Sequence, residues 1–408
     1  MFAEDVSLTE LADRLGTPLY VYSRATLTRH YRVMDEALSG VEHMICYSVK
    51  ANSNIAVLQL LASLGSGFDI VSLGELYRVL RAGGDPKRVV FSGVGKRDDE
   101  IEAALRAGIH CLNVESEWEL HQCAEVAERI GSVAPVSLRV NPDVDPNTHE
   151  YIATGLKSSK FGVPFEQARR LYRWAHENPH VHVVGVDCHI GSQIVEPGPL
   201  IEALDRVLEL VDELRASGVN IEHVDMGGGL GIKYKDERPA PPAEIGRAYA
   251  ERLASRGLQL LVEPGRVIAG NAGVMLMRVL GVKDNGDRRF VITDAAMNDN
   301  IRPSLYRAWQ ELCPVVLEPE RGSTVVDVVG PICESGDFFA RERDLQELQR
   351  GDLVAMRSAG AYGFCMASNY NSRPRAAEVM AHADTWQVIR PRESVDELFA
   401  TERLNDDL

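Results

Sequence analysis

The chain has 408 residues, of which 45% are hydrophobic and 25% charged, and its formal net charge is -16. This length predicts two or three domains with ample material for a core. The acidic balance argues against a nucleic-acid or anionic-membrane partner, because phosphate binding requires clustered cations. No apolar run approaches the roughly 18 residues that a membrane helix needs, which disfavours a membrane protein.

The seven cysteines indicate a reducing compartment. They form no CxxC pair and leave one cysteine over, which argues against a disulfide framework or a zinc site. The N-terminal stretch MFAEDVSLTE is acidic and unlike a secretory leader. We therefore expect a cytoplasmic protein with free thiols and no metal.

From residue 24 to about 270, short β-branched runs alternate with segments of helical period. A helix is expected over RATLTRHYRVMDEAL, and eight strands are expected at residues 45–49, 68–71, 88–92, 110–114, 135–140, 182–188, 221–226 and 258–263. Several of the helical segments end on a glycine, as a helix C-cap does. Eight such units in about 250 residues predict an α/β fold, a (β/α)8 barrel of the TIM type. An open doubly wound sheet is the weaker alternative.

After residue 275 the pattern changes to strands. The segment GVMLMRVLGVKDNGDRRFVITDA carries a hairpin turn at Asn285-Gly286, and further strands are expected in STVVDVVGPIC, DLVAMRSAG and TWQVIRP. A helical insertion is expected around DLQELQR. We predict a barrel domain over 24–275 and a β-rich domain, sandwich-like or barrel-like, over 276–408. The latter also takes residues 1–23, because PLYVYS supplies a strand.

A polar residue or a glycine loop ends every expected barrel strand. In chain order these ends are Lys50, Asp69, Ser92 with Gly93, Glu115, Arg139 with Asn141, HIGSQ (189–193), GGGLG (227–231) and EPGR (263–266). The active site of a (β/α)8 barrel lies at the C-terminal ends of its strands. These positions therefore locate the chemistry as well as support the fold.

Lys50 is the only one of eight lysines that ends an expected barrel strand. An amine in an apolar mouth can form a Schiff base with an aldehyde, although many strand-end lysines simply extend into solvent. The loop DMGGGLG can bring backbone amides close to a phosphate, or it can be a tight turn. An amine and a phosphate site together suggest pyridoxal phosphate.

Three further residues fit that cofactor. Glu263 would keep the pyridine nitrogen protonated, His189 would lie against the ring, and Ser192 would donate to the phosphate. The ordinary alternatives are an ion pair of Glu263 with Arg266 and a histidine that is merely part of the core.

Eight motifs resemble those of the diaminopimelate decarboxylases, a family of fold-type III pyridoxal-phosphate decarboxylases. They are YSVKAN, GFDIVSLGEL, HIGSQI, DMGGGLGI, EPGR, DAAMNDNIRPSLY, GPICESGDFF and GAYGFCMASNYNSRPR, in order from about residue 15 to 392. The last three point to this family among its siblings. The resemblance implies decarboxylation of meso-2,6-diaminopimelate to L-lysine and carbon dioxide, in a homodimer with shared active sites.

The resemblance also implies a role for each matching residue. Lys50 and Cys333 would be catalytic, the cysteine as the acid that protonates Cα and as a contribution from the other subunit. The cofactor would be bound by Lys50, Asp69, His189, Ser192, Gly227, Gly228, Gly229, Glu263, Gly265, Arg266 and Tyr362. The substrate would be bound by Arg266, Arg302, Tyr306, Glu334 and Tyr362.

The distal end of diaminopimelate is itself an amino acid, so a site for it needs cations and an anion together. Arg266 and Arg302 would bind the distal carboxylate and Glu334 the ammonium. A pocket for ornithine or lysine would have no use for both arginines. Two positions depart from the family pattern, Ser48 for alanine and Asp187 for histidine. We expect both side chains to point away from the site.

Three alternatives remain open on the sequence alone. The first is a sibling decarboxylase that acts on arginine, carboxynorspermidine or a D-amino acid. The second is an amino-acid racemase, which Glu263 disfavours because racemases of this architecture place an arginine there. The third is a non-catalytic homologue, which Lys50 and Cys333 disfavour.

Overall fold

The computed structural model describes residues 1–145, 154 and 160–405. It divides into two compact units. The barrel unit comprises residues 28–233 and 237–268, and the β unit comprises residues 1–27, 234–236 and 269–408. Each unit is described separately below.

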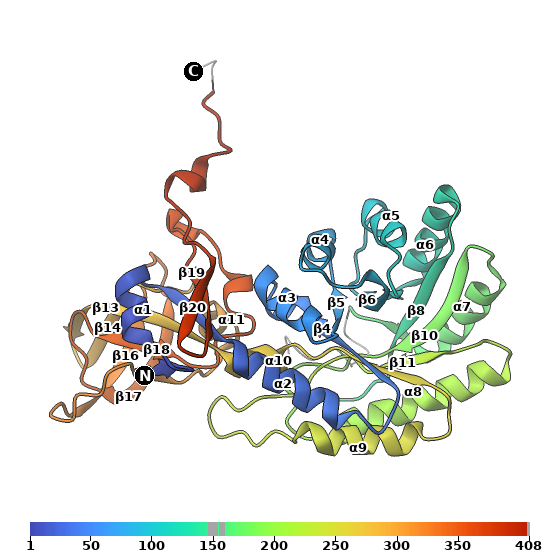
Figure 1. Cartoon of the computed structure of the whole chain (residues 1–408), viewed down its shortest axis with the longest axis horizontal. Helices are drawn as coiled ribbons and strands as arrows, with labels where there is room; N and C mark the ends of the chain where they lie inside the picture. Colours follow the sequence, from blue (N-terminus) through green and yellow to red (C-terminus); the bar gives the residue numbers. More distant parts are fainter. Residues whose placement is uncertain (146–153, 155–159, 406–408) are drawn as a thin grey trace. The chain divides into compact units, whose positions relative to one another are not determined.

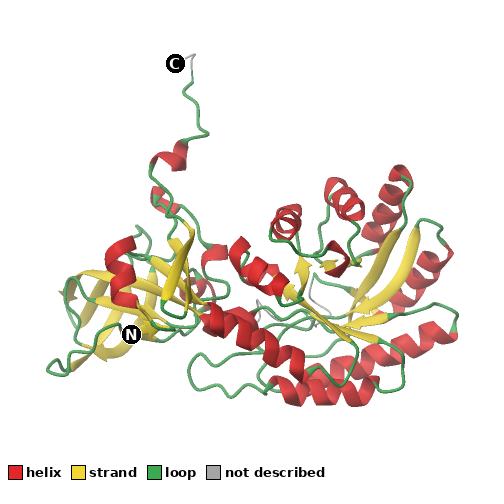
Figure 2. Cartoon of the chain, viewed as in Figure 1, coloured by secondary structure: helices red, strands yellow, loops and turns green. Residues whose placement is uncertain are grey.

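Eight parallel strands form the closed sheet of the barrel unit (Figures 1 and 2). They are β4 (His43–Ser48), β5 (Gly67–Ile70), β6 (Val89–Phe91), β7 (Cys111–Val114), β8 (Ala134–Asn141), β10 (Val181–Asp187), β11 (His223–Asp225) and β12 (Gln259–Val262). Closure depends on β10, which pairs with β11 on one side and with β8 on the other. All eight strands expected from the sequence are present, and the predicted barrel is confirmed.

Helices lie outside the strands, as Figure 1 shows. They are α2 (Arg24–Ala37), α3 (Ile55–Ser63), α4 (Leu73–Arg81), α5 (Asp98–Ala107), α6 (Glu117–Ile130), α7 (Phe165–Glu177), α8 (Gly198–Ala216), α9 (Pro242–Leu253) and the short α10 (Arg266–Ala269). Their ends follow from local chemistry. Ser72 and Ser116 accept hydrogen bonds from backbone amides in the first turns of α4 and α6. Gly108 and Gly131 end α5 and α6 in the left-handed conformation.

The β unit is built on a second sheet. Its strands are β3 (Leu19–Ser23), β13 (Gly273–Asn285), β14 (Arg288–Thr293), β15 (Leu312–Pro314), β16 (Ser323–Val329), β17 (Phe338–Gln346), β18 (Leu353–Met356), β19 (Ala377–His382) and β20 (Thr385–Arg390). The unit also holds α1 (Leu8–Leu15), α11 (Arg302–Tyr306) and the two-residue strands β1 (Phe2–Ala3) and β2 (Val6–Ser7). The strand expected in PLYVYS is confirmed as β3, which pairs with β13 and β19. A further two-residue strand, β9 (Val163–Pro164), pairs with β8 of the barrel.

Two local predictions for the β unit were wrong. The segment DLQELQR is not helical, because β17 continues to Gln346 and pairs with β16. Leu345 and Leu348 have helical spacing, but neither lies in a helix. Leu345 is buried within β17, and Leu348 is buried in the segment that follows the strand. The hairpin turn is one residue later than expected. Asn285 pairs with Arg288, so the turn residues are Gly286, at φ +62°, and Asp287.

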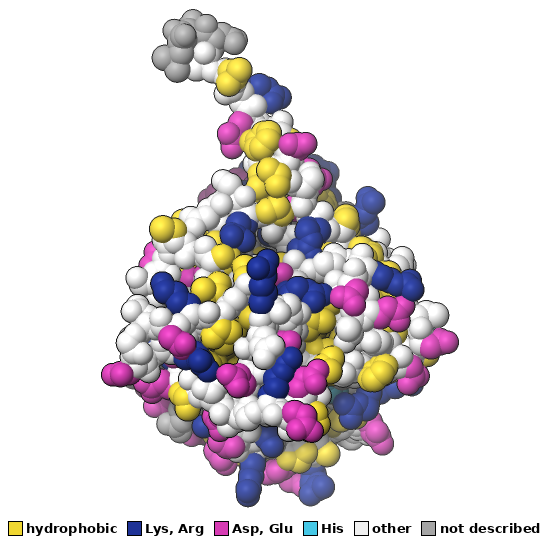
Figure 3. Space-filling model, turned by 90° about the vertical axis from the view of Figure 1, so that its left-hand side faces the viewer, with side chains coloured by type: hydrophobic (Ala, Val, Ile, Leu, Met, Phe, Trp, Pro, Cys, Tyr) yellow, Lys and Arg dark blue, Asp and Glu magenta, His cyan; other side chains and the backbone are white. Residues whose placement is uncertain are grey.

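Charges of both signs are mixed on one face of the molecule (Figure 3). On the face drawn in Figure 3, Lys and Arg side chains alternate with Asp and Glu, and this face shows no broad field of one sign. Among the described helices, none is both long and apolar enough to cross a membrane.

Two helical glycines test how tightly the barrel helices pack. A methyl group on Gly246 in α9 would lie 1.9 Å from the carbonyl oxygen of Ala37, whereas one on Gly74 in α4 would meet nothing closer than 3.8 Å. We expect Gly246→Ala to destabilise the protein by about 1–3 kcal/mol through overpacking. Gly74→Ala should be neutral or stabilise by up to about 1 kcal/mol, because alanine favours the helix. Thermal unfolding of both variants checks this, and equal midpoints would contradict the packing described.

Candidate active site

Lys50 lies just beyond the end of β4 and forms an ion pair with a buried carboxylate in the barrel mouth. The strand ends at Ser48, and a single 3-10 turn over Val49–Ala51 presents the lysine. Its Nζ donates to Oδ2 of Asp69 at 2.6 Å. The Asp69 side chain is fully buried while that of Lys50 is 37% exposed. The buried carboxylate therefore anchors the amine, which stays partly exposed and open to a ligand.

Ser48 and Asp187 face the site, contrary to the prediction that they point away. Ser48 Oγ donates to Asp69 Oδ2 at 3.1 Å and to the Glu263 carbonyl at 2.9 Å. Asp187 is 1% exposed and lies within the barrel beside Asp225 and Glu263. For Ser48 the reason is the pleat of β4, because residues two apart in a strand share a face, and Ser48 shares its face with Met44 and Cys46 of a buried apolar cluster.

Asp187, Asp225 and Glu263 form a buried carboxyl cluster at the ends of β10, β11 and β12. Burial, followed by the neighbouring acids, raises the pKa of Glu263 and of Asp187 well above their usual values. Burial also raises the pKa of Asp225 to about 6. Adjacent buried carboxyl groups resist ionising together. We therefore expect this cluster to hold protons at neutral pH.

Glu263 is held in place by neutral donors. Ser92 Oγ donates to Glu263 Oε1 at 3.3 Å, and Asn113 Nδ2 donates to Ser92 Oγ at 3.2 Å and to Glu263 Oε1 at 3.4 Å. The sequence placed Ser92 at a strand end but gave no role to Asn113, which lies within β7. Alternation could have found it, because Asn113 follows Cys111 by two residues on the inward face.

His189 and the glycine loop support one another. The Gly228 N–H donates to Nδ1 of His189 at 3.2 Å, which leaves the ring proton on Nε2. Burial, with Arg139 and Lys50 nearby, lowers the pKa of His189 well below its usual value, so the ring is neutral. Arg139 itself is paired with Glu115 at 3.1 Å.

The three glycines are required by close approach. A methyl group on Gly228 would lie 2.3 Å from the Glu263 carbonyl oxygen, and one on Gly227 would lie 2.6 Å from the His189 ring. Gly229 has φ +111°, and its methyl group would lie 2.7 Å from the Gly191 carbonyl. The loop therefore forms a cradle that side chains cannot fill.

Ser192 and Arg266 meet beside this cradle. Arg266 Nη2 donates to Ser192 Oγ at 3.0 Å. Arg266 begins α10 immediately after Gly265, and both are buried. A guanidinium and a hydroxyl next to a glycine cradle suit an oxyanion such as phosphate.

The remaining predicted residues belong to the β unit. The buried Arg302 begins α11, and its guanidinium lies 4.6 Å from the Tyr234 ring centroid. Cys333 and Glu334 are exposed in the loop after β16. Ser304 Oγ on α11 donates to the Gly336 carbonyl at 2.6 Å, which holds that loop against the helix. Within this unit, the structure therefore brings together the short helix Arg302–Tyr306 and the loop of Cys333 and Glu334.

Tyr362 lies in a separate loop of the β unit, beyond β18. Its backbone has φ +55°, a conformation that is uncommon for a tyrosine. The following Gly363 permits a close approach, because a methyl group there would lie 2.7 Å from the Ala359 carbonyl and 2.8 Å from the Tyr20 hydroxyl. This tight turn fixes where the tyrosine is presented.

Comparison with known proteins places these residues in a family context. The family model described as the pyridoxal binding domain of pyridoxal-dependent decarboxylases matches residues 24–270. The diaminopimelate decarboxylase of Vibrio cholerae is 54% identical over 98% of this chain and 96% of its own length. That of Pseudomonas aeruginosa is also 54% identical, over 99% of this chain and 97% of its own.

Solved structures of decarboxylases share the fold of this chain. Diaminopimelate decarboxylase from Helicobacter pylori, complexed with L-lysine, is 41% identical with a TM-score of 0.94, covering 97% of this chain and 98% of that one. A lysine/ornithine decarboxylase from Vibrio vulnificus is 23% identical with a TM-score of 0.81, covering 92% of this chain and 97% of that one, and so shares the fold.

The buried carboxyl cluster makes stability depend on pH in a defined direction. The pKa of Asp225 is raised from 3.8 to about 6, so the folded state holds this proton more tightly than the unfolded chain. Stability is therefore lost as pH rises from about 4 to about 6 and stays lower above that range. Asp225→Asn keeps an acceptor for the Gly227 N–H and should raise the free energy of unfolding by about 1–3 kcal/mol near pH 7.5.

The gain from Asp225→Asn should shrink near pH 4.5, where the native aspartate keeps its proton. Glu209→Gln, at an exposed position on α8, is the control and should change little at either pH. Chemical denaturation at both pH values measures the difference. A gain that is the same at both would contradict the raised pKa.

Proposed function

The chain belongs to the diaminopimelate decarboxylases, within the family of pyridoxal-dependent decarboxylases. We propose which of its residues bind the cofactor, bind the substrate and transfer the proton. It decarboxylates meso-2,6-diaminopimelate to L-lysine and carbon dioxide with pyridoxal 5'-phosphate as cofactor. The observation that carries this proposal is the partly exposed Lys50 amine on the buried Asp69 carboxylate, in the mouth of a barrel whose eighth strand is followed at once by Glu263.

The barrel residues fit the cofactor. Lys50 would hold its aldehyde carbon, and His189 would lie against its ring. The loop of Gly227, Gly228 and Gly229, with Ser192, Gly265 and Arg266, would hold its phosphate, where methyl groups on the three loop glycines would collide with backbone or the His189 ring. When bound, pyridoxal phosphate supplies a ring that accepts the electron pair released as carbon dioxide leaves Cα.

Glu263 would share a proton with the pyridine nitrogen. Its pKa is raised by burial and by neighbouring acids, so its carboxyl group holds a proton before the cofactor binds. The Glu263 carboxyl group beside the nitrogen would favour the protonated form of the ring. Ser92 and Asn113 orient the same oxygen, Oε1, and so fix where the proton lies.

The β-unit residues would recognise the substrate. Arg302 and Arg266 supply planar guanidinium groups for a carboxylate, and Glu334 supplies the anion for the distal ammonium. Tyr306 and Tyr362 would also bind the substrate. Cys333 would deliver a proton to Cα, a step for which the acidity of a thiol is suitable.

We further propose a homodimer in the cytoplasm, with each active site shared. Cys333 and Glu334 are exposed in the single chain, which supports a position against a partner. All seven cysteines are free, which supports a reducing compartment.

Replacing the lysine tests the assignment directly. Lys50→Ala should leave the barrel folded but lower carbon dioxide release from meso-diaminopimelate by at least about a thousandfold, because the amine that holds the cofactor is gone. Lys87→Ala, at an exposed lysine, is the control and should keep full activity. Release from arginine, carboxynorspermidine or a D-amino acid by the native protein, with none from diaminopimelate, would overturn the substrate assignment.

Subunit mixing tests the shared site. Lys50→Ala and Cys333→Ala should each be inactive alone, but co-expressed chains should regain about a quarter of native activity, because half the dimers then contain one intact site. The control pair, Lys50→Ala with Glu263→Gln, damages the same barrel and should regain nothing. No recovery in the first pair, with dimers present, would show that Cys333 acts within its own chain.

A further inference from the structure

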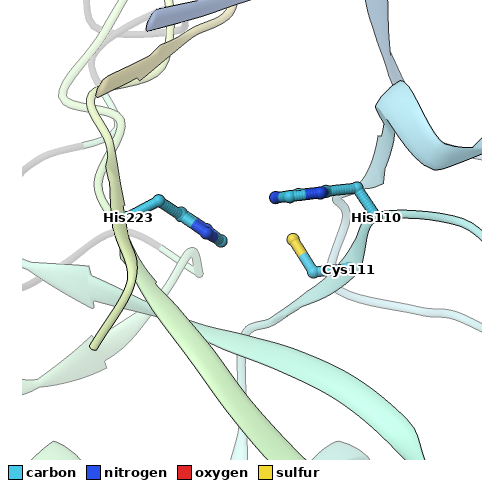
Figure 4. A group of neighbouring side chains, drawn as sticks. All are labelled: His110, Cys111 and His223. Carbon is cyan, nitrogen blue, oxygen red and sulfur yellow. The ribbon is translucent and has the colours of Figure 1, made fainter. Parts of the chain in front are cut away.

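Three side chains of metal-binding type meet at the N-terminal ends of the barrel strands, opposite the end that carries Lys50. Cys111 begins β7, His110 precedes it, and His223 begins β11. Their candidate donor atoms lie within 4.8 Å of one another. Figure 4 shows the three side chains pointing toward a common centre. The proposed decarboxylation uses none of them.

Both imidazole rings present an unused nitrogen. Nε2 of His110 and Nε2 of His223 are buried and, among the described residues, have no hydrogen-bond partner. His223 is only 1% exposed, and the two ring centroids are 5.1 Å apart. Buried nitrogens in native proteins are nearly always satisfied. Two that face one another without a partner therefore indicate a missing ligand.

The surroundings make room for these rings and orient them. On β10, which pairs with β11, a methyl group on Gly185 would lie 2.1 Å from Nε2 of His223, so this glycine opens the space that the ring occupies. The His110 ring is held by a hydrogen bond to the Lys87 backbone. Metal-binding histidines are oriented in the same way through their other ring nitrogen.

The donor set selects a chemical class. Two imidazoles and one thiol suit zinc and similar borderline or soft cations, whereas magnesium and calcium prefer oxygen ligands. Cys111 also lies in an apolar cluster with Met44, Cys46 and Leu261, which shields the position from bulk water.

We propose that His110, Cys111 and His223 form a binding site for a zinc-class divalent cation. Binding would form two metal–nitrogen bonds and one metal–sulfur bond, and the Cys111 thiol would release its proton to solvent. Bond lengths of about 2.0–2.3 Å place tetrahedral ligands about 3.5 Å apart, so the side chains must close by about 1 Å. One coordination position would stay open. The cation would tie β7 to β11, which are separated in the sheet by β8 and β10.

The test uses the cofactor-loaded enzyme and Zn²⁺ alone as the probe. After dialysis against a chelator and then against Zn²⁺, the native protein should retain one equivalent of zinc per chain, and its thermal midpoint should rise with zinc concentration. Cobalt substitution should give visible absorption bands typical of tetrahedral coordination by sulfur and nitrogen. Cys111→Ser and His110→Gln should each weaken binding by roughly tenfold or more. Because His110 is partly exposed and Cys111 is buried, His110→Gln should disturb folding less than Cys111→Ser.

Matched controls separate this site from adventitious binding. Cys123→Ser changes another buried cysteine and His180→Gln another partly exposed histidine, and both should keep the native zinc stoichiometry and midpoint shift. Zinc should leave the rate of decarboxylation unchanged in His110→Gln and in the native protein alike. A native protein that retains no zinc, or retention that His110→Gln and Cys111→Ser leave intact, would overturn the proposal.

Discussion

The pairing of β10 with β8 closes the sheet, and the rest of the barrel follows from that closure. A closed sheet has an inside, and alternation sends every second side chain of each strand into it. Along β11 these inward residues are His223 and Asp225, and Gly227 follows just beyond the end of the strand. They belong in turn to the histidine–cysteine cluster, the carboxyl cluster and the glycine cradle, so one strand passes through all three layers.

Closure also explains why the interior chemistry is unusual. Water is excluded, so acids that lie together cannot all ionise, and the pKa of Glu263 rises. Asp69 differs from these acids because Lys50 and Ser48 both donate hydrogen bonds to its carboxyl group. The role of each interior carboxyl group therefore depends on its partners. Asp69 anchors the Lys50 amine, whereas Glu263 holds a proton where the cofactor would bind.

Much of this arrangement could be predicted from the sequence. Parallel barrel strands are continuous β-branched runs, and their C-terminal ends must meet, so the polar residues that follow them form one site. Lys50, Asp69 and Glu263 could be found in this way. The inward orientation of Ser48 and Asp187 was within reach of the same alternation but was predicted wrongly. Asn113 was missed because it lies inside a strand rather than at its end.

Other features depend on contacts that no local pattern reveals. The segment DLQELQR has leucines at helical spacing, yet pairing with β16 makes its first part a strand. His110 and His223 are distant in sequence, so no ligand spacing marks them, and only the closed barrel brings them together. The prediction that the chain holds no metal was drawn from cysteine spacing, which cannot detect ligands supplied by two separate strands.

The central claim is that Lys50 is the amine that holds the cofactor. Borohydride treatment of the pyridoxal-phosphate-loaded protein fixes the cofactor to whichever amine carries it, and peptide mass spectrometry then identifies that residue. The expected result is one pyridoxyl group per chain on the peptide that contains Lys50. Modification at another lysine, such as the buried Lys96, or at none would contradict the claim.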